Sequence, residues 1–192
     1  MMSIRLWLSQ LLLRIIYRRV LHPDKPIYRY VERYLPPLDG MVVDLGGGPG
    51  HLYRGLIDRG AKYVVVVDID YGMFDSSKYD FDKVVADASQ KIFRDASVDY
   101  VVIHDALHHF PNPDETIRTY RRSIKRCMII FDIDRASLSG RLAQVLERIL
   151  GFPSRFYTMD ECISILEESS YNIRKGLALD GSGEYLVEAC ID

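Results

Sequence analysis

The sequence predicts an α/β fold built around one mostly parallel β-sheet. From Met41 onward, segments with strand character alternate with segments of helical periodicity, as in a chain of β-α-β units. The stretch VVDLGGGPG at residues 42–50 has the pattern of a buried strand that turns sharply into a helix. The unbroken apolar run YVVVVD at residues 63–68 is typical of a central parallel strand that is buried on both faces.

The predicted strands are short and rich in apolar, mostly β-branched residues. They cover residues 41–45, 63–68, 83–86, 98–103, 127–133, 173–179 and 185–191. The last two strands are joined by DGSG at residues 180–183, which is a hairpin signal. Because this loop is too short for a crossover, the final pair should be antiparallel.

The predicted helices carry recognisable signals at their ends. They cover residues 50–59, 71–79, 114–122, 138–150 and 159–168. Pro113 begins the third of them, and Gly151 ends the fourth. Thr158 and Glu161 have the spacing of a capping box at the start of the last one.

Residues 1–37 are predicted to form a separate N-terminal helical segment, and residues 38–192 the α/β domain. Within the first segment, periodicity predicts helices at 4–21 and 27–35, and Pro36 and Pro37 mark the boundary. The first helix has a wide apolar arc interrupted by arginines. The sequence leaves open whether it covers the domain as a lid, forms a dimer surface or makes a peripheral membrane contact, so the oligomeric state is open as well.

Composition excludes several classes of protein. The net charge is −2, so nucleic acid is not the expected partner, although residues 1–34 carry seven Lys/Arg against two acids, a local charge of +5. Cys127, Cys162 and Cys190 lack CxxC spacing, which predicts buried free cysteines in a reducing compartment rather than a disulfide or zinc framework. No run approaches the ~20 apolar residues of a spanning helix, so we expect a cytoplasmic protein.

Acidic residues stand at the ends of consecutive predicted strands. They are Asp44, Asp68, Asp87 and, just after the fourth strand, Asp105. The carboxyl ends of parallel strands meet at one edge of the sheet, where open α/β sheets bind their ligands. Asp44 suits a cationic ligand there. Asp68 lies 18 residues after Gly50, where a carboxylate can bind both hydroxyls of a ribose.

The glycine spacing discriminates between nucleotide-binding patterns. The dinucleotide fingerprint GxGxxG fails, because His51 or Tyr53 stands where its third glycine is needed. The Walker pattern with its lysine is absent as well. The pattern that fits is DxGxGxG, formed by Asp44, Gly46, Gly48 and Gly50.

In these motifs the sequence resembles the class I S-adenosylmethionine-dependent methyltransferases, in particular the small methyltransferase-like domains of the type 11 group. The resemblance covers residues 41–191, with motifs at 42–50, 67–70, 86–88, 98–102, 107–110 and 156–161. It implies a three-layer, Rossmann-like, seven-stranded sheet of order 3-2-1-4-5-7-6 with the last strand antiparallel. It also implies S-adenosyl-L-methionine as the cofactor.

The resemblance further implies a role for each matching residue. The backbone of Gly46, Gly47 and Gly48 would approach the methionine part of the cofactor, and Asp44 would orient its ammonium group. Asp68 would bind the ribose, and Ile69 would pack on the adenine. Asp87 and the Ala88 amide would bind the adenine edge, and the region of His104 would border the sulfonium.

Two histidines after the fourth strand are the candidate catalytic residues, His108 and His109, because histidine is the natural general base near neutral pH. Related methyltransferases often carry a histidine here that only packs beside the cofactor, so the packing role stays open. We expect no metal, since a site made from His104, Asp105, His108 and Asp132 would lie on a strand end and loop without helical i,i+4 spacing. His51 is expected on the surface.

The function implied is methyl transfer from S-adenosylmethionine to a small, partly apolar acceptor. An apolar end near the crevice is predicted from Ile149, Leu150, Phe152, Phe156 and Tyr157. The Asn/Asp-Pro-Pro-aromatic motif is absent after the fourth strand, which argues against methylation of adenine or glutamine amino groups by that motif. Two alternatives remain: a methyltransferase for RNA or protein that uses the basic residues 1–34, and a non-catalytic cofactor-binding partner subunit.

Overall fold

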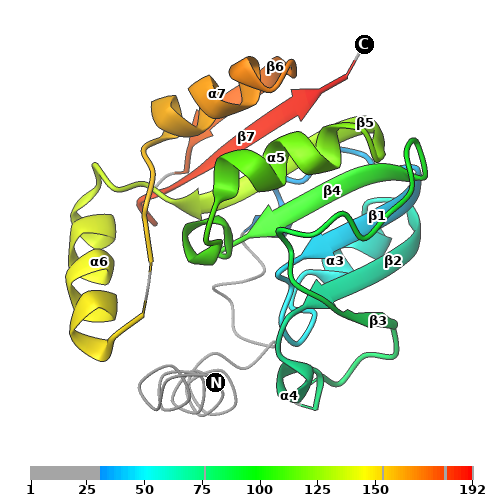
Figure 1. Ribbon diagram of the computed structural model, residues 1–192, viewed down its shortest axis with the longest axis horizontal. Helices are drawn as coiled ribbons and strands as arrows, with labels where there is room; N and C mark the ends of the chain where they lie inside the picture. Colours follow the sequence, from blue (N-terminus) through cyan, green and yellow to red (C-terminus); the bar gives the residue numbers. More distant parts are fainter. Residues whose placement is uncertain (1–30, 76, 153, 180, 192) are drawn as a thin grey trace.

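A seven-stranded sheet runs through the middle of the molecule in the order β3-β2-β1-β4-β5-β7-β6 (Figure 1). The computed structural model describes residues 31–75, 77–152, 154–179 and 181–191. Neighbouring strands are parallel from β3 to β5, and β7 is antiparallel to both β5 and β6. The predicted fold class, strand order and antiparallel last strand are therefore confirmed.

The strands and helices keep the predicted order. Most of their ends lie within three residues of the prediction, but α4 ends five residues earlier than predicted. The strands are β1 Gly40–Leu45, β2 Ala61–Asp68, β3 Asp82–Val85, β4 Val98–His104, β5 Ile124–Ile133, β6 Asn172–Ala178 and β7 Glu184–Cys190. The helices are α3 Tyr53–Asp58, α4 Tyr71–Phe74, α5 Pro113–Arg121, α6 Leu138–Leu150 and α7 Met159–Glu168, with the 3₁₀ turn η1 at Leu107–His109. The predicted helix 4–21 lies outside the described residues, as does the beginning of 27–35, so the division at residue 37 stays a prediction.

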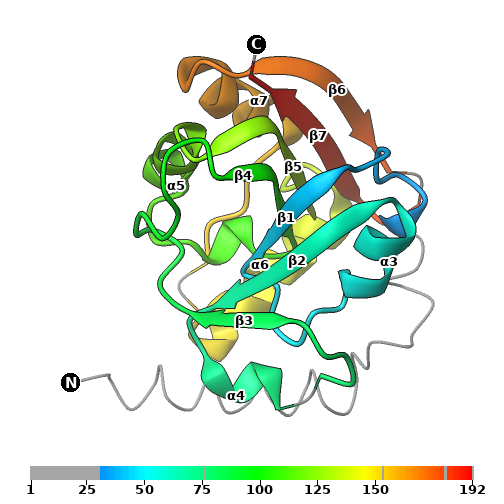
Figure 2. The ribbon, with the colours of Figure 1, turned by 90° about the vertical axis from the view of Figure 1, so that its right-hand side faces the viewer.

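Alternate side chains of the central strands enter two separate cores, which makes the fold three-layered. Val43 and Val101 face the core that α5 and α7 cover, whereas Val42 and Val102 face the core beneath α3. Figure 2 shows α5 and α3 on opposite sides of the sheet. Leu35, near the start of the described chain, is buried in the α3 core. Among the described residues, no helix has the length and apolar character needed to cross a bilayer.

Helix α6 stands at the margin of the sheet and contributes little to either core (Figure 1). Ser137 caps its first turn, and Gly151 ends it in the left-handed conformation with φ 82°. Only Gly140 of this helix is buried. An apolar stripe of large side chains faces outward, formed by Leu138, Leu142, Val145, Leu146 and Ile149. Ile149 is 76% exposed, which corrects its expected place in an apolar end near the crevice.

Cys127 and Cys190 form a disulfide, which corrects the prediction that all three cysteines are free. They stand directly opposite each other on the antiparallel strands β5 and β7. The sequence separation of 63 residues concealed this neighbourhood, because strand pairing is decided by topology. Cys162 is the buried free cysteine among the described residues.

The predicted capping box at the start of α7 is present. The Thr158 hydroxyl accepts a hydrogen bond from the Glu161 amide at 3.2 Å, and the Glu161 carboxylate accepts one from the Thr158 amide at 2.8 Å. We expect Thr158→Ala to lower the free energy of unfolding by about 1 kcal/mol in urea titrations. Ser164→Ala, an exposed change in the same helix, should alter it by less than about 0.5 kcal/mol. Equal losses in the two variants would contradict the capping role.

Candidate functional site

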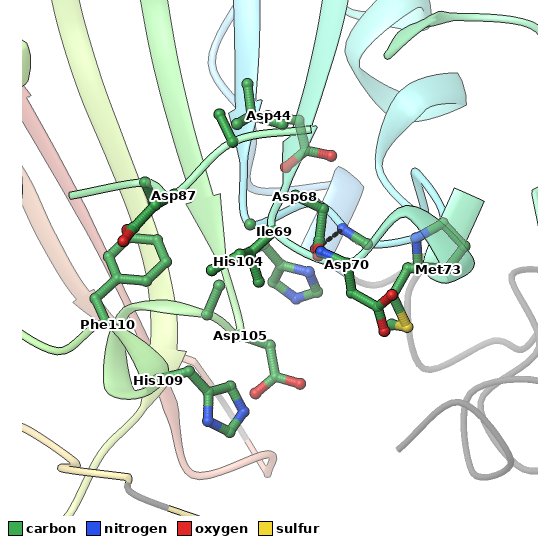
Figure 3. A pocket seen from close by; sticks show the side chains of 18 of the residues that line it. Asp44, Asp68, Ile69, Asp70, Met73, Asp87, His104, Asp105, His109 and Phe110 are labelled. Carbon is green, nitrogen blue, oxygen red and sulfur yellow. Dashed lines mark hydrogen bonds between the residues drawn. The ribbon is translucent and has the colours of Figure 1, made fainter. Parts of the chain in front are cut away.

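A cavity of about 360 Å³ lies at the carboxyl ends of β1, β2, β3 and β4 (Figure 3). Its size is in the range of small-molecule sites. All nine residues predicted to contact the cofactor line it, namely Asp44, Gly46, Gly47, Gly48, Asp68, Ile69, Asp87, Ala88 and His104. They come from four strand ends because parallel strands deliver their carboxyl ends to one edge of the sheet.

Asp44 is the most unusual group in the cavity. Its side chain is almost fully buried at the end of β1, and its Oδ1 atom accepts no hydrogen bond from the described residues. Burial, and then the neighbouring Asp68 carboxylate, raise the pKa of Asp44 to about 7. A buried carboxylate oxygen without a partner is costly, so it indicates a site for a cationic or hydrogen-bonding ligand. This geometry fits the ammonium group of S-adenosylmethionine.

The turn between β1 and α3 admits only glycine at its closest approaches. A Cβ on Gly47 would lie 2.5 Å from the Asp44 carboxyl carbon, so any other residue would force the Asp44 side chain or the turn to move. Gly48 adopts φ 52°, a left-handed backbone conformation that residues other than glycine rarely adopt. The turn therefore leaves bare backbone facing the cavity.

Asp68 is held rigidly at the end of β2. Its Oδ2 accepts a hydrogen bond from the Gly48 amide at 2.9 Å, and its Oδ1 accepts one from the Asp70 amide at 2.8 Å (Figure 3). Burial raises the pKa of Asp68, although these two amides oppose the effect. Each carboxylate oxygen has a second lone pair, so the group can still accept hydrogen bonds from two ribose hydroxyls.

The next positions form the side of the cavity where adenine is expected. Ile69 is 63% exposed although it is large and apolar, so its side chain is available to pack on a flat ring. Asp87 follows β3, where its Oδ1 accepts hydrogen bonds from the amide and hydroxyl of Ser89 at 2.9 and 2.8 Å. These bonds fix the carboxylate beside Ala88 in the cavity wall.

The end of β4 brings His104 and Asp105 into the same cavity. Burial lowers the pKa of His104 to about 4, against the opposing charge of Asp132, which makes the imidazole neutral at physiological pH. Asp105 has φ 51°, a left-handed conformation in a residue other than glycine. Burial raises the pKa of its carboxyl to about 6. Strain at this position supports a functional role for the strand end, and Asp105 is a lining residue that was not among the predicted contacts.

The two candidate catalytic histidines occupy different environments. His109 lines the cavity (Figure 3), whereas His108 is 2% exposed and lies outside its lining. The His108 ring stacks on Phe156 with 4.3 Å between ring centroids, and its Nδ1 lies 2.6 Å from the Asp132 carboxylate. Burial lowers the pKa of His108, but Asp132 outweighs it and holds the pKa well above 6.5. His108 is therefore not positioned to contact a molecule in the cavity directly.

Other lining residues were not among the predicted cofactor contacts. His51, expected on the surface, is buried and lines the cavity, because the turn before α3 folds back toward β2. Met73 reaches the cavity from α4, and Phe110 from the segment after η1. Phe152, which the sequence predicted at the apolar end near the crevice, reaches it from the loop after α6. Phe156 and Tyr157, expected at this end, are buried. Only contacts made in the folded chain select among these apolar residues.

Comparison with known proteins identifies relatives of this chain. The family described as "Methyltransferase domain" matches residues 43–130, which include the glycine turn and β2 to β4. No curated protein matches the sequence.

Solved structures share the fold at low sequence identity. The methyltransferase in the complex with the Haloferax volcanii Trm112 methyltransferase activator is 16% identical, with 97% of this chain and 96% of that chain covered and a TM-score of 0.75. An S-adenosylmethionine-dependent methyltransferase from Mesorhizobium loti is 17% identical, with coverage of 88% and 100% and a TM-score of 0.72. Magnesium protoporphyrin IX methyltransferase from Synechocystis PCC 6803, with bound SAH, is 20% identical, with coverage of 97% and 96% and a TM-score of 0.68.

Proposed function

The chain carries, at residues 43–130, a methyltransferase domain of the class I S-adenosylmethionine-dependent family, and from this premise we propose that it methylates a small, partly apolar acceptor. The cofactor supplies an electrophilic methyl group on its sulfonium. Asp44, Gly47 and Asp68 are the residues that would hold it, because they leave a bare turn, an orphaned carboxylate oxygen and a fixed carboxylate in one cavity.

The acceptor proposal depends on the residues that line the cavity beyond the ends of the strands. Phe152 and Pro111 contribute apolar surface, and Asp105 and His109 contribute the polar groups. The rings of His109 and Phe152 lie 6.3 Å apart, so one acceptor can contact both. This wall suits a molecule with an apolar body and one hydroxyl, thiol or amine.

Methyl transfer by in-line displacement depends chiefly on alignment. Holding two reactants in the correct geometry can lower a barrier by about 7–11 kcal/mol. His109 is the histidine that can orient an acceptor, because it lines the cavity, and His108 lies outside the lining. Under this proposal Phe152 aligns the apolar body, and His109 accepts a hydrogen bond from the acceptor's polar group.

The acceptor side can be tested with Phe152→Ala. We expect the KM for apolar acceptors to rise about tenfold, because burying a phenyl group contributes roughly 1.5–3 kcal/mol, while the Kd for S-adenosylmethionine stays within about twofold. Steady-state kinetics and calorimetry measure the two quantities. Ile149→Ala removes an apolar side chain that is 76% exposed on the neighbouring helix and should change neither. A uniform loss for polar and apolar acceptors would contradict this role of Phe152.

The function itself is tested by calorimetric titration with S-adenosylmethionine and its demethylated product, followed by transfer of a labelled methyl group to a panel of acceptors. Turnover of small partly apolar alcohols, thiols or amines supports the proposal. Turnover of RNA or protein alone overturns it in favour of a macromolecular acceptor. Cofactor binding without turnover on any acceptor points to a partner subunit instead.

A further inference from the structure

A histidine pair and a glutamate from a distant helix meet beside the cavity, which His109 alone of the three lines. His108 and His109 lie in η1 after β4, and Glu147 projects from α6. One donor atom of each of these three residues lies within 4.8 Å of the donor atoms of the other two. The two imidazole rings are 4.1 Å apart between centroids. This cluster is separate from the aspartates and glycines assigned to the cofactor.

His108 is oriented so that one ring nitrogen points at Glu147. Its Nδ1 lies 2.6 Å from Asp132 Oδ1, and its backbone amide donates to Asp132 Oδ2 at 3.1 Å. Asp132 Oδ1 also accepts a hydrogen bond from the Ile133 amide at 2.8 Å, which fixes the carboxylate. A carboxylate behind one imidazole nitrogen is the usual device that leaves the other nitrogen free to bind a metal.

The distance between His108 and Glu147 is close to the separation of two ligands on one metal ion. His108 Nε2 and Glu147 Oε1 are 3.7 Å apart, an ion-pair distance when His108 is protonated, and a metal ion bound between them would displace that proton. Two ligands on one tetrahedral zinc ion, each bonded at about 2.1 Å, lie about 3.4 Å apart. Glu147 Oε2 is buried and accepts no hydrogen bond from the described residues, so this carboxylate has an unused ligand atom.

His109 has a polar neighbour of its own and also faces the cavity. Its Nδ1 lies 3.4 Å from the Ser154 hydroxyl, an outer partner for the second imidazole. Because His109 also lines the cavity, the cluster has an open side through which an ion can enter. Within the described part of the chain, two other groups of potential ligands are weaker candidates. In the cysteine cluster of Cys127, Glu188 and Cys190, the two cysteines are joined in a disulfide. In the group of Asp105, His108 and Asp132, the Nδ1 atom of His108 is already hydrogen-bonded to Asp132.

We propose that His108, His109 and Glu147 bind one divalent transition-metal ion, with zinc as the first candidate. Two imidazoles and one carboxylate suit zinc and its neighbours, and three protein ligands leave a position open for water or substrate. The site goes beyond the proposed methyl transfer. If the acceptor occupies the part of the cavity lined by His109 and Phe152, its oxygen or sulfur atom would contact the metal ion instead of the His109 imidazole.

Metal binding is tested on the full chain after treatment with a chelator, using Zn²⁺ alone in calorimetry and Co²⁺ alone in absorption spectroscopy. We expect one saturable equivalent. Glu147→Gln and His109→Gln should each weaken binding at least about 100-fold, because loss of an outer partner alone costs about 10–100-fold. Glu188→Gln, from the cysteine cluster, should leave the affinity unchanged.

A second measurement keeps the proposal falsifiable if a variant folds poorly. X-ray absorption at the zinc edge of the wild-type protein should show two imidazoles and no sulfur. No saturable uptake, sulfur ligands, or equal affinity in wild type and Glu147→Gln would each overturn the metal site. Binding of S-adenosylmethionine is measured separately, so a protein that binds the cofactor and takes up no metal disproves this site and leaves the proposed function standing.

Discussion

Replacing Asp68 with alanine should weaken S-adenosylmethionine binding about 100-fold or more, because two hydrogen bonds to a charged carboxylate contribute about 1.5–3 kcal/mol each. The carboxylate is held between the amides of Gly48 and Asp70, so its position does not depend on the ligand. Calorimetric titration of the variant measures the loss directly. Asp82→Ala, an exposed change at the start of the neighbouring strand β3, should leave the affinity unchanged.

A ligand control separates the ribose contact from a general effect on the glycine turn. A cofactor analogue that lacks both ribose hydroxyls should bind wild-type protein about as weakly as the natural cofactor binds Asp68→Ala. If the variant keeps its affinity within about threefold of the wild type, or if the analogue binds wild type as tightly as the cofactor does, Asp68 does not bind the ribose.

Affinity for the cofactor should rise about tenfold from pH 6 to pH 8 because of Asp44. The pKa of this buried carboxyl is raised to about 7, so the empty site is mostly protonated at pH 6 and mostly ionised at pH 8. Only the ionised form attracts the ammonium group of the cofactor. Calorimetry across this range measures the slope. Adenosine lacks the ammonium group and should show no comparable pH dependence.

Asp44→Asn should remove this pH dependence and stabilise the empty protein at pH 8. Because the folded pKa is raised above the ordinary value of 3.8, the folded state binds a proton that the unfolded state releases. The stability associated with Asp44 is therefore present below about pH 4 and is lost as pH rises through about 7. Thermal unfolding at pH 8 should show a higher Tm for Asp44→Asn. A lower Tm, together with an unchanged pH slope, would contradict a buried charge that serves the ligand.

Much of the fold could be predicted because its signals are local. The apolar run of β2, the glycines after β1 and the capping box of α7 each depend on neighbours in the sequence, and all three are present. The ends of α3 and α4 were predicted less well, since helix ends fray and depend on packing. The disulfide was missed because it joins residues that only the pairing of β5 with β7 brings together.

By itself the sequence determined that acidic and glycine residues would gather at one edge of a parallel sheet. The reason is geometric, because parallel strands that end in such residues must present them together. Only the tertiary structure decided which of His108 and His109 faces the cavity, which of Phe152 and Phe156 lines it and where Glu147 lies. Those outcomes depend on how η1 and α6 pack against the sheet, and such contacts between distant segments leave no period or spacing in the chain.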